Sequence, residues 1–204
     1  MEEPKIRVAI VNYGMGNIRS VYNAFKYLKA EVNVVDDPLK LNLEKEKIVI
    51  PGVGAFEDGI KNIQPFISKI MEAISLGKPI LGICIGLQMF FEESEESTKA
   101  KGLGLIKGRV VKIRTNLKLP HIGWNKLKIV KDGCPLFKEV KDGYVYFVHS
   151  YHALPAEEDV IVAKTEYGCE VTAAVWKNNV YGVQFHPEKS GRTGLKILKN
   201  FLEL

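Results

Sequence analysis

Strand-like and helix-like segments alternate through the first half of this 204-residue chain. The β-branched run at residues 6–11 is followed by apolar residues at helical spacing, among them Ile18, Val21 and Phe25. The alternation continues with strand-like runs at residues 32–35, 47–54 and 79–83 and helix-like stretches at residues 55–76 and 86–94. It predicts a parallel sheet with helices on both faces and functional loops at the carboxyl ends of the strands.

Short β-rich runs replace this alternation after about Gly102. They lie at residues 108–113, 123–130, 144–154, 160–165, 172–176 and 180–185, and a helix predicted from Thr193 to Leu204 closes the chain. No linker rich in Pro, Gly or Ser and no internal repeat interrupts the sequence. We therefore expect one domain over residues 1–204, of the α/β class. A mostly parallel central sheet flanked by helices would carry an antiparallel, β-rich extension in its second half.

The composition argues against a membrane, exported or nucleic-acid-binding protein. No apolar run approaches the roughly 20 residues that span a bilayer, and the acidic start leads into an apolar run too short for a signal peptide, so we expect a cytoplasmic location. The net charge of +5 comes from dispersed lysines, without a basic block that would suit nucleic acid. Three widely spaced cysteines without a CxxC pair predict neither a disulfide framework nor a zinc site.

One cysteine stands between two glycines where the strand at 79–83 turns into the next predicted helix. Gly82, Cys84 and Gly86 form a G-x-C-x-G pattern, the thiol counterpart of the nucleophile elbow of serine hydrolases. Such a turn projects the side chain into a loop crevice, and the amino terminus of the following helix favours the thiolate. A small buried cysteine with packed glycines would give the same pattern, so the motif alone leaves both interpretations open.

A thiolate that expels an amine also needs a proton shuttle and a group that orients it. Of the four histidines, only His186 has a carboxylate placed to hold it. Pro187 favours an extended conformation for the residue before it, which would put His186 and Glu188 on the same side of the chain. In isolation, the HPE segment is more typical of a turn with solvated charges, so its catalytic interpretation depends on Cys84.

The segment IVIPGVGAF at residues 48–56 supplies a third element. An apolar strand ends there in Pro51, Gly52, Val53 and Gly54. A glycine-flanked backbone N–H at the end of a strand can point at a developing oxyanion, together with the N–H of Ile85. Alone the segment indicates only a tight turn, but with the other two elements it predicts acyl transfer.

GICIGLQ, PGVG and QFHPEKS occur in the order and spacing of class I glutamine amidotransferases, which the sequence resembles over nearly its full length. Within that family, the segments at residues 12–21, 51–59, 119–125 and 146–153 resemble the glutaminase subunits of imidazole glycerol phosphate synthase, an enzyme of histidine biosynthesis. The resemblance implies a flavodoxin-like fold and no cofactor or metal.

The resemblance also implies roles for individual residues. Cys84 would attack the side-chain amide of glutamine, His186 would pass a proton to the leaving ammonia, Glu188 would orient His186, and hydrolysis of the thioester would release glutamate. The oxyanion would be bound by Gly52, Val53 and Ile85, and glutamine by Gly54, Gln88, Ser150 and Tyr151. Ile85 stands where the family usually has Leu, a change that leaves the backbone N–H available.

By the same resemblance, the ammonia passes to a separate cyclase subunit, a (βα)8 barrel bound as a 1:1 heterodimer. That subunit makes imidazole glycerol phosphate and an aminoimidazole carboxamide ribotide. The predicted interface residues are Asn17, His121, Trp124, Asn125 and Lys189. Judged from its surroundings in the sequence alone, Trp124 would suit a core position instead.

Three other functions remain open at this point. A stand-alone thiol hydrolase would be active without a partner, whereas a glutaminase subunit is expected to turn over glutamine slowly alone, because the loop at residues 51–54 is completed on assembly. A regulatory subunit of the same fold would leave glutamine unaltered. The subunits of anthranilate or pyridoxal phosphate synthesis share the triad without NYGMGN or PHIGWN. Cys134 and Cys169 match no family motif and are interpreted as structural.

Overall fold

An eight-stranded sheet forms the centre of the molecule in the computed structural model, which describes residues 6–141 and 143–204; the acidic start of the chain lies outside these ranges. The strand order is β2-β1-β3-β4-β14-β13-β12-β9. The first five strands run parallel and the last three pair antiparallel, which confirms the predicted α/β class. The strands are β1 (Arg7–Val11), β2 (Glu31–Val35), β3 (Glu46–Gly52), β4 (Ile80–Cys84), β9 (Lys128–Ile129), β12 (Ile161–Glu166), β13 (Glu170–Lys177) and β14 (Val180–Val183).

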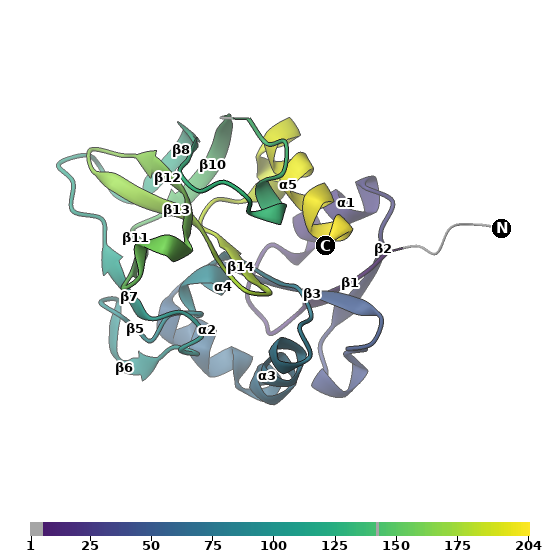
Figure 1. Ribbon diagram of the computed structural model, residues 1–204. Helices are drawn as coiled ribbons and strands as arrows, with labels where there is room; N and C mark the ends of the chain where they lie inside the picture. Colours follow the sequence, from purple (N-terminus) through teal and green to yellow (C-terminus); the bar gives the residue numbers. More distant parts are fainter. Residues whose placement is uncertain (1–5, 142) are drawn as a thin grey trace.

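Helices cover both faces of this sheet, as the alternation predicted. Figure 1 shows α1 and α5 on one side and α3 on the other, with α2 beside α3. Between α1 and α5 the rings of Phe25 and Phe201 lie 6.4 Å apart. The α-helices are α1 (Ile18–Tyr27), α2 (Phe56–Ile63), α3 (Ile67–Ser75), α4 (Ile85–Gln88) and α5 (Gly191–Glu203), and the 3-10 turns are η1 (Pro38–Lys40), η2 (Gln64–Phe66), η3 (Pro135–Phe137), η4 (Glu158–Val160) and η5 (Pro187–Lys189).

Helix α1 illustrates how the sequence determines where a helix begins and which of its faces is buried. The side chain of Asn17 caps its amino terminus by accepting a hydrogen bond from the Ser20 amide. Val21, Ala24 and Phe25 form the buried stripe that faces the sheet, at the spacing seen in the sequence. The cap and the stripe together position the loop before α1 close to the carboxyl ends of the parallel strands.

Two smaller sheets extend the molecule beyond the strands of the central sheet. One pairs β8 (His121–Lys126) with β10 (Tyr144–His149), and the other has the order β11-β7-β5-β6. Its strands are β5 (Glu93–Ser94), β6 (Ser97–Lys101), β7 (Gly108–Lys112) and β11 (Tyr151–Pro155). The run predicted as one strand at residues 144–154 therefore divides at Ser150, whose carbonyl accepts from Ile113 N, into strands of two different sheets.

The predicted helix at residues 86–94 is wrong in length. The helix α4 spans only Ile85–Gln88, and β5 begins at Glu93. Amides of residues 102–106 return to bond the carbonyls of residues 89–92, and a Cβ on Gly102 would lie 1.9 Å from the Phe91 oxygen. Met89, Phe90 and Phe91 are all buried, so this run fills the core on every side and has no polar face that a surface helix needs.

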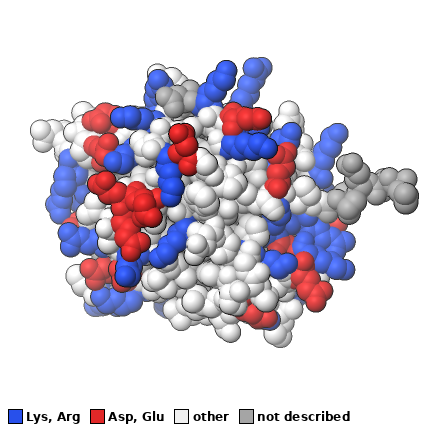
Figure 2. Space-filling model, in the orientation of Figure 1, with Lys and Arg blue, Asp and Glu red and all other residues white. Residues whose placement is uncertain are grey.

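Charged side chains are distributed without a single-sign region on the face shown in Figure 2, where Lys and Arg alternate with Asp and Glu. Among residues 6–141 and 143–204, no helix combines the length and apolarity that a bilayer crossing requires.

Candidate active site

Cys84 occupies a strained backbone position at the end of β4. Its φ of 56° and ψ of −109° lie in a region that non-glycine residues rarely adopt, at a cost of about 1–3 kcal/mol. A Cβ on Gly86 would lie 1.9 Å from the Ile50 carbonyl oxygen, and one on Gly82 would lie 2.6 Å from the Phe90 ring. The glycines are therefore required by packing, and the turn is an elbow of the kind that the G-x-C-x-G pattern predicts.

His186 and Glu188 form a buried pair beside this elbow. Their side chains are 2% and 1% exposed, and His186 Nδ1 lies 2.9 Å from Glu188 Oε1. His186 is extended as predicted, but Glu188 lies in the 3-10 turn η5 rather than on a continuing extended segment. The contact is as predicted, while the local geometry that creates it is a turn begun by Pro187.

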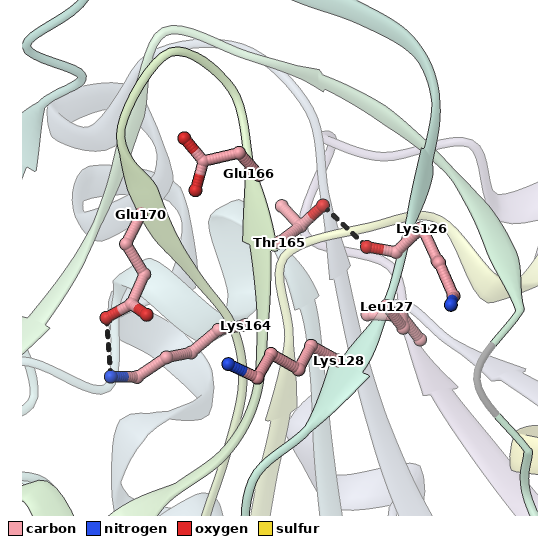
Figure 3. A pocket seen from close by; sticks show the side chains of 7 residues that line it. All are labelled: Lys126, Leu127, Lys128, Lys164, Thr165, Glu166 and Glu170. Atoms are coloured by element: carbon pink, nitrogen blue, oxygen red, sulfur yellow. Dashed lines mark hydrogen bonds and ion pairs between the residues drawn. The ribbon is translucent and has the colours of Figure 1, made fainter.

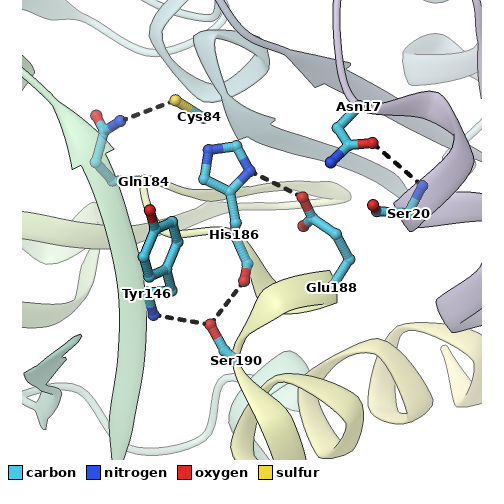
Figure 4. A network of polar contacts seen from close by, with 8 residues as sticks. All are labelled: Asn17, Ser20, Cys84, Tyr146, Gln184, His186, Glu188 and Ser190. Carbon is cyan, nitrogen blue, oxygen red and sulfur yellow. Dashed lines mark hydrogen bonds and ion pairs between the residues drawn. The ribbon is translucent and has the colours of Figure 1, made fainter. Parts of the chain in front are cut away.

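The carboxyl ends of neighbouring strands bring these residues together. In the register of β3, β4 and β14, Gly52 pairs with Cys84, and Val183, three residues before His186, pairs with Ile83. Figure 4 shows the His186 ring between Cys84 and Glu188. Although His186 lies 102 positions after Cys84 in the sequence, adjacent strand ends supply both.

Strand β10 holds the loop that carries His186. The His186 amide donates to the Tyr146 carbonyl at 2.9 Å, and the Ser190 hydroxyl donates to the His186 carbonyl at 2.6 Å. Tyr146 N donates to the same hydroxyl at 2.9 Å, as Figure 4 shows. Ser190 is buried and was not predicted as a site residue; its position four residues after the histidine was the available signal.

The pKa of His186 is displaced upward. Burial alone would lower this pKa, but the side chains of Cys84 and Glu188 favour the protonated ring and raise the pKa to about 10. The Nε2 atom is buried and makes no hydrogen bond within the described part of the chain. The ring therefore keeps its proton through neutral pH, with Nδ1 fixed by Glu188 and Nε2 left for a reacting group.

Replacing Glu188 with Gln tests this electrostatic arrangement. Because the neutral amide withdraws the negative charge, we expect the pKa of His186 to fall from about 10 toward its ordinary value near 6.5. The ring would then lose its proton between pH 6.5 and 10, a range in which the native ring stays charged. Proton NMR of the imidazole measures the titration, and an unchanged midpoint would contradict the assignment. We expect glutamine turnover to fall about 100-fold or more.

A cavity of about 330 Å³ opens in front of Cys84. It is lined by most of the predicted oxyanion and glutamine-site residues: Val53, Gly54, Ile85, Gln88, Ser150 and Tyr151. Gly52 does not line it. The sequence did not single out four further lining residues, namely Glu96, Pro120, Val148 and His149. The separate motifs thus meet at one cavity, which a shared role in binding and hydrolysing glutamine requires.

Side-chain amides form a buried row between this cavity and the sulfur. Gln88 Nε2 donates to the Tyr151 carbonyl and to Gln184 Oε1, both at 3.0 Å. Gln184 Nε2 donates to Cys84 Sγ at 3.6 Å. Gln88 Oε1 is buried without a partner in the described residues, so it can accept a hydrogen bond from a ligand. Gln184 was not predicted, although it stands two residues before His186.

The loop at Pro51–Gly54 packs tightly against the elbow. A Cβ on Gly52 would lie 2.6 Å from the Tyr13 hydroxyl and 2.8 Å from Ile85 Cβ, so only glycine fits there. The Tyr13 hydroxyl donates to the Pro51 carbonyl at 2.6 Å, and burial raises the pKa of Tyr13. Gly54 has a φ of +110°, which lets the chain turn toward the cavity.

The predicted interface residue His121 requires correction. Its side chain is fully buried, because it stacks on Phe147 and Tyr167 and lies 3.1 Å from His149. A side chain enclosed in this way offers no surface to a partner. Burial also lowers the pKa of His149, to about 3; its neutral ring donates from Nδ1 to the Tyr151 carbonyl.

The other predicted interface residues reach the surface to different extents. Trp124 is 53% exposed and packs edge-on against Tyr146, so it is not a core residue. Lys189 is exposed, with Nζ 5.7 Å from the Tyr146 ring centre. Asn17 and Asn125 are half-buried; Asn125 bonds His121 and the Glu166 carbonyl.

A second hollow of about 370 Å³ lies between β8, β9 and the end of β12 (Figure 3). Its ring of charged side chains includes the ion pair Lys164–Glu170, at 2.5 Å. It is not lined by any cysteine or histidine, so it lacks the groups that acyl transfer needs.

Cys134 lies in a turn before η3, where burial raises its pKa to about 11, and Cys169 is half-buried. Within the described residues, no group of three metal-binding side chains occurs.

The fold and the elbow site correspond to a known class of enzyme. The family model "Glutamine amidotransferase class-I" matches residues 9–204, and the chain belongs to this family. Solved structures agree in fold: PurLQS from Thermotoga maritima superposes with a TM-score of 0.78 at 21% identity, covering 98% of this chain and 99% of that one. A glutamine amidotransferase crystal structure gives a TM-score of 0.74 at 18% identity, covering 96% and 97%.

Curated relatives narrow the assignment. Imidazole glycerol phosphate synthase subunit HisH from Methanocaldococcus jannaschii is 50% identical and covers 97% of this chain and 99% of its own. The subunit of the same name from Methanothermobacter thermautotrophicus is 47% identical, covering 97% and 98%. The chain is a glutaminase subunit of imidazole glycerol phosphate synthase, an enzyme of histidine biosynthesis.

Proposed function

We propose that Cys84, His186 and Glu188 hydrolyse glutamine through a thioester. One observation carries this proposal: Cys84, held at a positive φ, lies at the cavity beside the buried His186–Glu188 pair. Cys84 Sγ attacks the side-chain amide carbon, and the tetrahedral oxyanion is bound by the backbone around Gly52, Val53 and Ile85. We also infer that residues 1–204 form one amidotransferase domain acting in the cytoplasm.

His186 handles the protons of both half-reactions. With a pKa near 10, the ring holds a proton that Nε2 delivers to the departing amide nitrogen, so ammonia leaves as the thioester forms. The neutral ring then takes a proton from the water that attacks the thioester, and glutamate is released. Glu188 keeps Nδ1 protonated and the ring oriented throughout.

The cavity supplies acceptors suited to the amino-acid end of glutamine. Gln88 Oε1 is buried and has no hydrogen-bond partner among residues 6–141 and 143–204, and the Glu96 carboxylate lines the same cavity while accepting from Phe56 N at 2.8 Å. Both oxygens can accept from an α-ammonium group. Gly54, Ser150 and Tyr151, which line the same cavity, complete the proposed glutamine site.

We further propose that ammonia is transferred to a cyclase subunit of (βα)8 barrel form, bound one to one, which makes imidazole glycerol phosphate and aminoimidazole carboxamide ribotide. The curated relatives are named as subunits of a synthase, which supports the existence of a partner. The exposed apolar side chains of Ile122, Trp124 and Tyr144 on β8 and β10 support this face as the docking surface.

Replacing Trp124 with Ala should weaken partner binding about 10- to 100-fold, because an exposed aromatic side chain can anchor an interface. Stability of the isolated chain should change little, since the ring is half-exposed. Isothermal titration with the cyclase subunit measures the affinity. Leu39→Ala is the matched control, because Leu39 is 85% exposed on η1. Equal affinities for both variants and the native chain would contradict the assignment of this face.

Assay of glutamate release with and without the cyclase subunit tests the whole proposal. Slow hydrolysis by the isolated chain that accelerates in a one-to-one complex would support it. Full activity without a partner would favour a stand-alone thiol hydrolase, and unaltered glutamine in the complex would favour a regulatory subunit. Capture of a chorismate-using partner instead would contradict the proposed pathway.

A further inference from the structure

Gln184 is a fully buried amide that none of the proposed catalytic steps uses. It follows β14 directly, and its backbone amide donates to the Ala173 carbonyl at 2.9 Å. Two residues later the chain reaches His186. The side chain extends toward Cys84 from the β14 side, and Figure 4 shows its amide nitrogen directed at the sulfur. Buried polar groups are normally hydrogen-bonded, so the direction of this amide toward the nucleophile needs a physical explanation.

The orientation of this amide is dictated by a neighbouring backbone group. The Tyr151 carbonyl can only accept, so Gln88 must turn its NH2 group toward it. The second proton of that NH2 group then points at Gln184, so the Gln184 side chain must accept this hydrogen bond with its oxygen, Oε1. The NH2 group of Gln184 is thereby left facing Cys84 Sγ at 3.6 Å. One fixed carbonyl thus sets the direction of two amides.

We propose that Gln184 is an electrostatic partner of the nucleophile, donating an N–H hydrogen bond that stabilises Cys84 Sγ whenever the sulfur carries negative charge. Hydrogen bonds to ionised acceptors are stronger than those between neutral groups, and burial strengthens them further. This bond acts before attack on the amide and again when the thioester breaks and the sulfur leaves. Gln184 itself forms no covalent bond and transfers no proton.

The inference rests on the proposed function, since it assumes that Cys84 is the nucleophile. It adds a donor on the side of the sulfur that His186 does not occupy. It also links the glutamine site to the reacting atom, because Gln88 lines the cavity and bonds directly to Gln184. Movement of Gln88 on binding substrate would therefore act on the sulfur through a single intermediate amide.

Alkylation of Cys84 by iodoacetamide between pH 5 and 10, followed by mass spectrometry of the Cys84 peptide, tests this bond. Gln184→Met keeps the length of the side chain and removes the donor. Gln184→Glu keeps an oxygen for Gln88 and replaces the donor by a second oxygen. Gln64→Glu, at an exposed position in η2, controls for the change of charge. Thermal unfolding identifies which variants are folded, and Gln184→Met serves if a buried acid prevents folding.

We expect alkylation of Cys84 near pH 7 to slow about 10- to 100-fold in the Gln184 variants. For Gln184→Met, the rate should approach the native rate at pH 10. The thiolate absorbance near 240 nm, taken as the difference from Cys84→Ala, should shift to higher pH in parallel. A folded variant whose alkylation profile overlays the native one would overturn the inference. Failure of the proposed function looks different, because Cys84→Ala would then still hydrolyse glutamine.

Discussion

Replacing Cys84 with Ala is expected to reduce glutamine-dependent synthesis by a factor of about 10⁴ or more, because removal of a nucleophile leaves only binding and oxyanion stabilisation. Synthesis from added ammonium salts by the complex should persist, since that route does not need the elbow. The measurement compares the two nitrogen sources in the presence of the cyclase subunit. Glutamate release by Cys84→Ala at the native rate would exclude the thioester.

A matched control is present in the same chain. Cys169 is half-buried and distant in sequence from every motif of the site. The Cys169→Ser variant should therefore keep native activity with either nitrogen source. A large loss in this variant would show that cysteine replacement disturbs the protein in general, and the Cys84 result would then lose its meaning.

Replacing Gly86 with Ala should lower the free energy of unfolding by about 3 kcal/mol or more. The new Cβ would lie 1.9 Å from the Ile50 carbonyl oxygen, and a backbone atom of β3 cannot rotate away as a side chain could. The elbow must shift as a whole, so turnover should fall about 100-fold even in the molecules that fold. Urea unfolding and glutamate release measure the two effects separately.

Gly104→Ala gives the comparison for this prediction. Gly104 has a φ of +63°, a backbone conformation that residues with a side chain rarely adopt. However, no atom lies within 4 Å of the position that a Cβ would take there. Its replacement should cost only the left-handed penalty, about 1–2 kcal/mol, and leave turnover unchanged. Equal destabilisation by the two substitutions would mean that the close approach to β3 is not what requires Gly86.

The alternating pattern predicted β2, β1, β3 and β4 correctly because each strand and helix there carries its own local signal. The run at residues 180–185 was expected in the antiparallel extension, but β14 pairs parallel with β4. Residues 6–11 and 18–28 show β-branched and helical periodicity that neighbours in sequence determine. The region after Gln88 lacks such a signal. Its carbonyls are bonded by amides from residues 102–106, and a contact between distant segments cannot be recognised from the local pattern.

The site shows the same division. Cys84, His186 and Glu188 lie within two residues of glycines or a proline that restrict the backbone, so their meeting at one site could be predicted. Gln184 and Tyr13 act through partners far away in the chain, Gln88 and Pro51, so their contacts could not be recognised from the local sequence. The burial of His121 depends likewise on stacking with Tyr167, in a turn that the sequence does not relate to it.

The position of β14 in the sheet has a consequence for the order in which the molecule can be completed. It follows the other seven strands of the central sheet in the sequence, yet it lies between β4 and β13 in the interior of that sheet. A chain that ends before β14 contains Cys84 but lacks His186, the proposed proton shuttle. On the proposed function, the strand that completes the sheet also leads to the proton shuttle, so we expect a chain truncated before β14 to release no ammonia from glutamine.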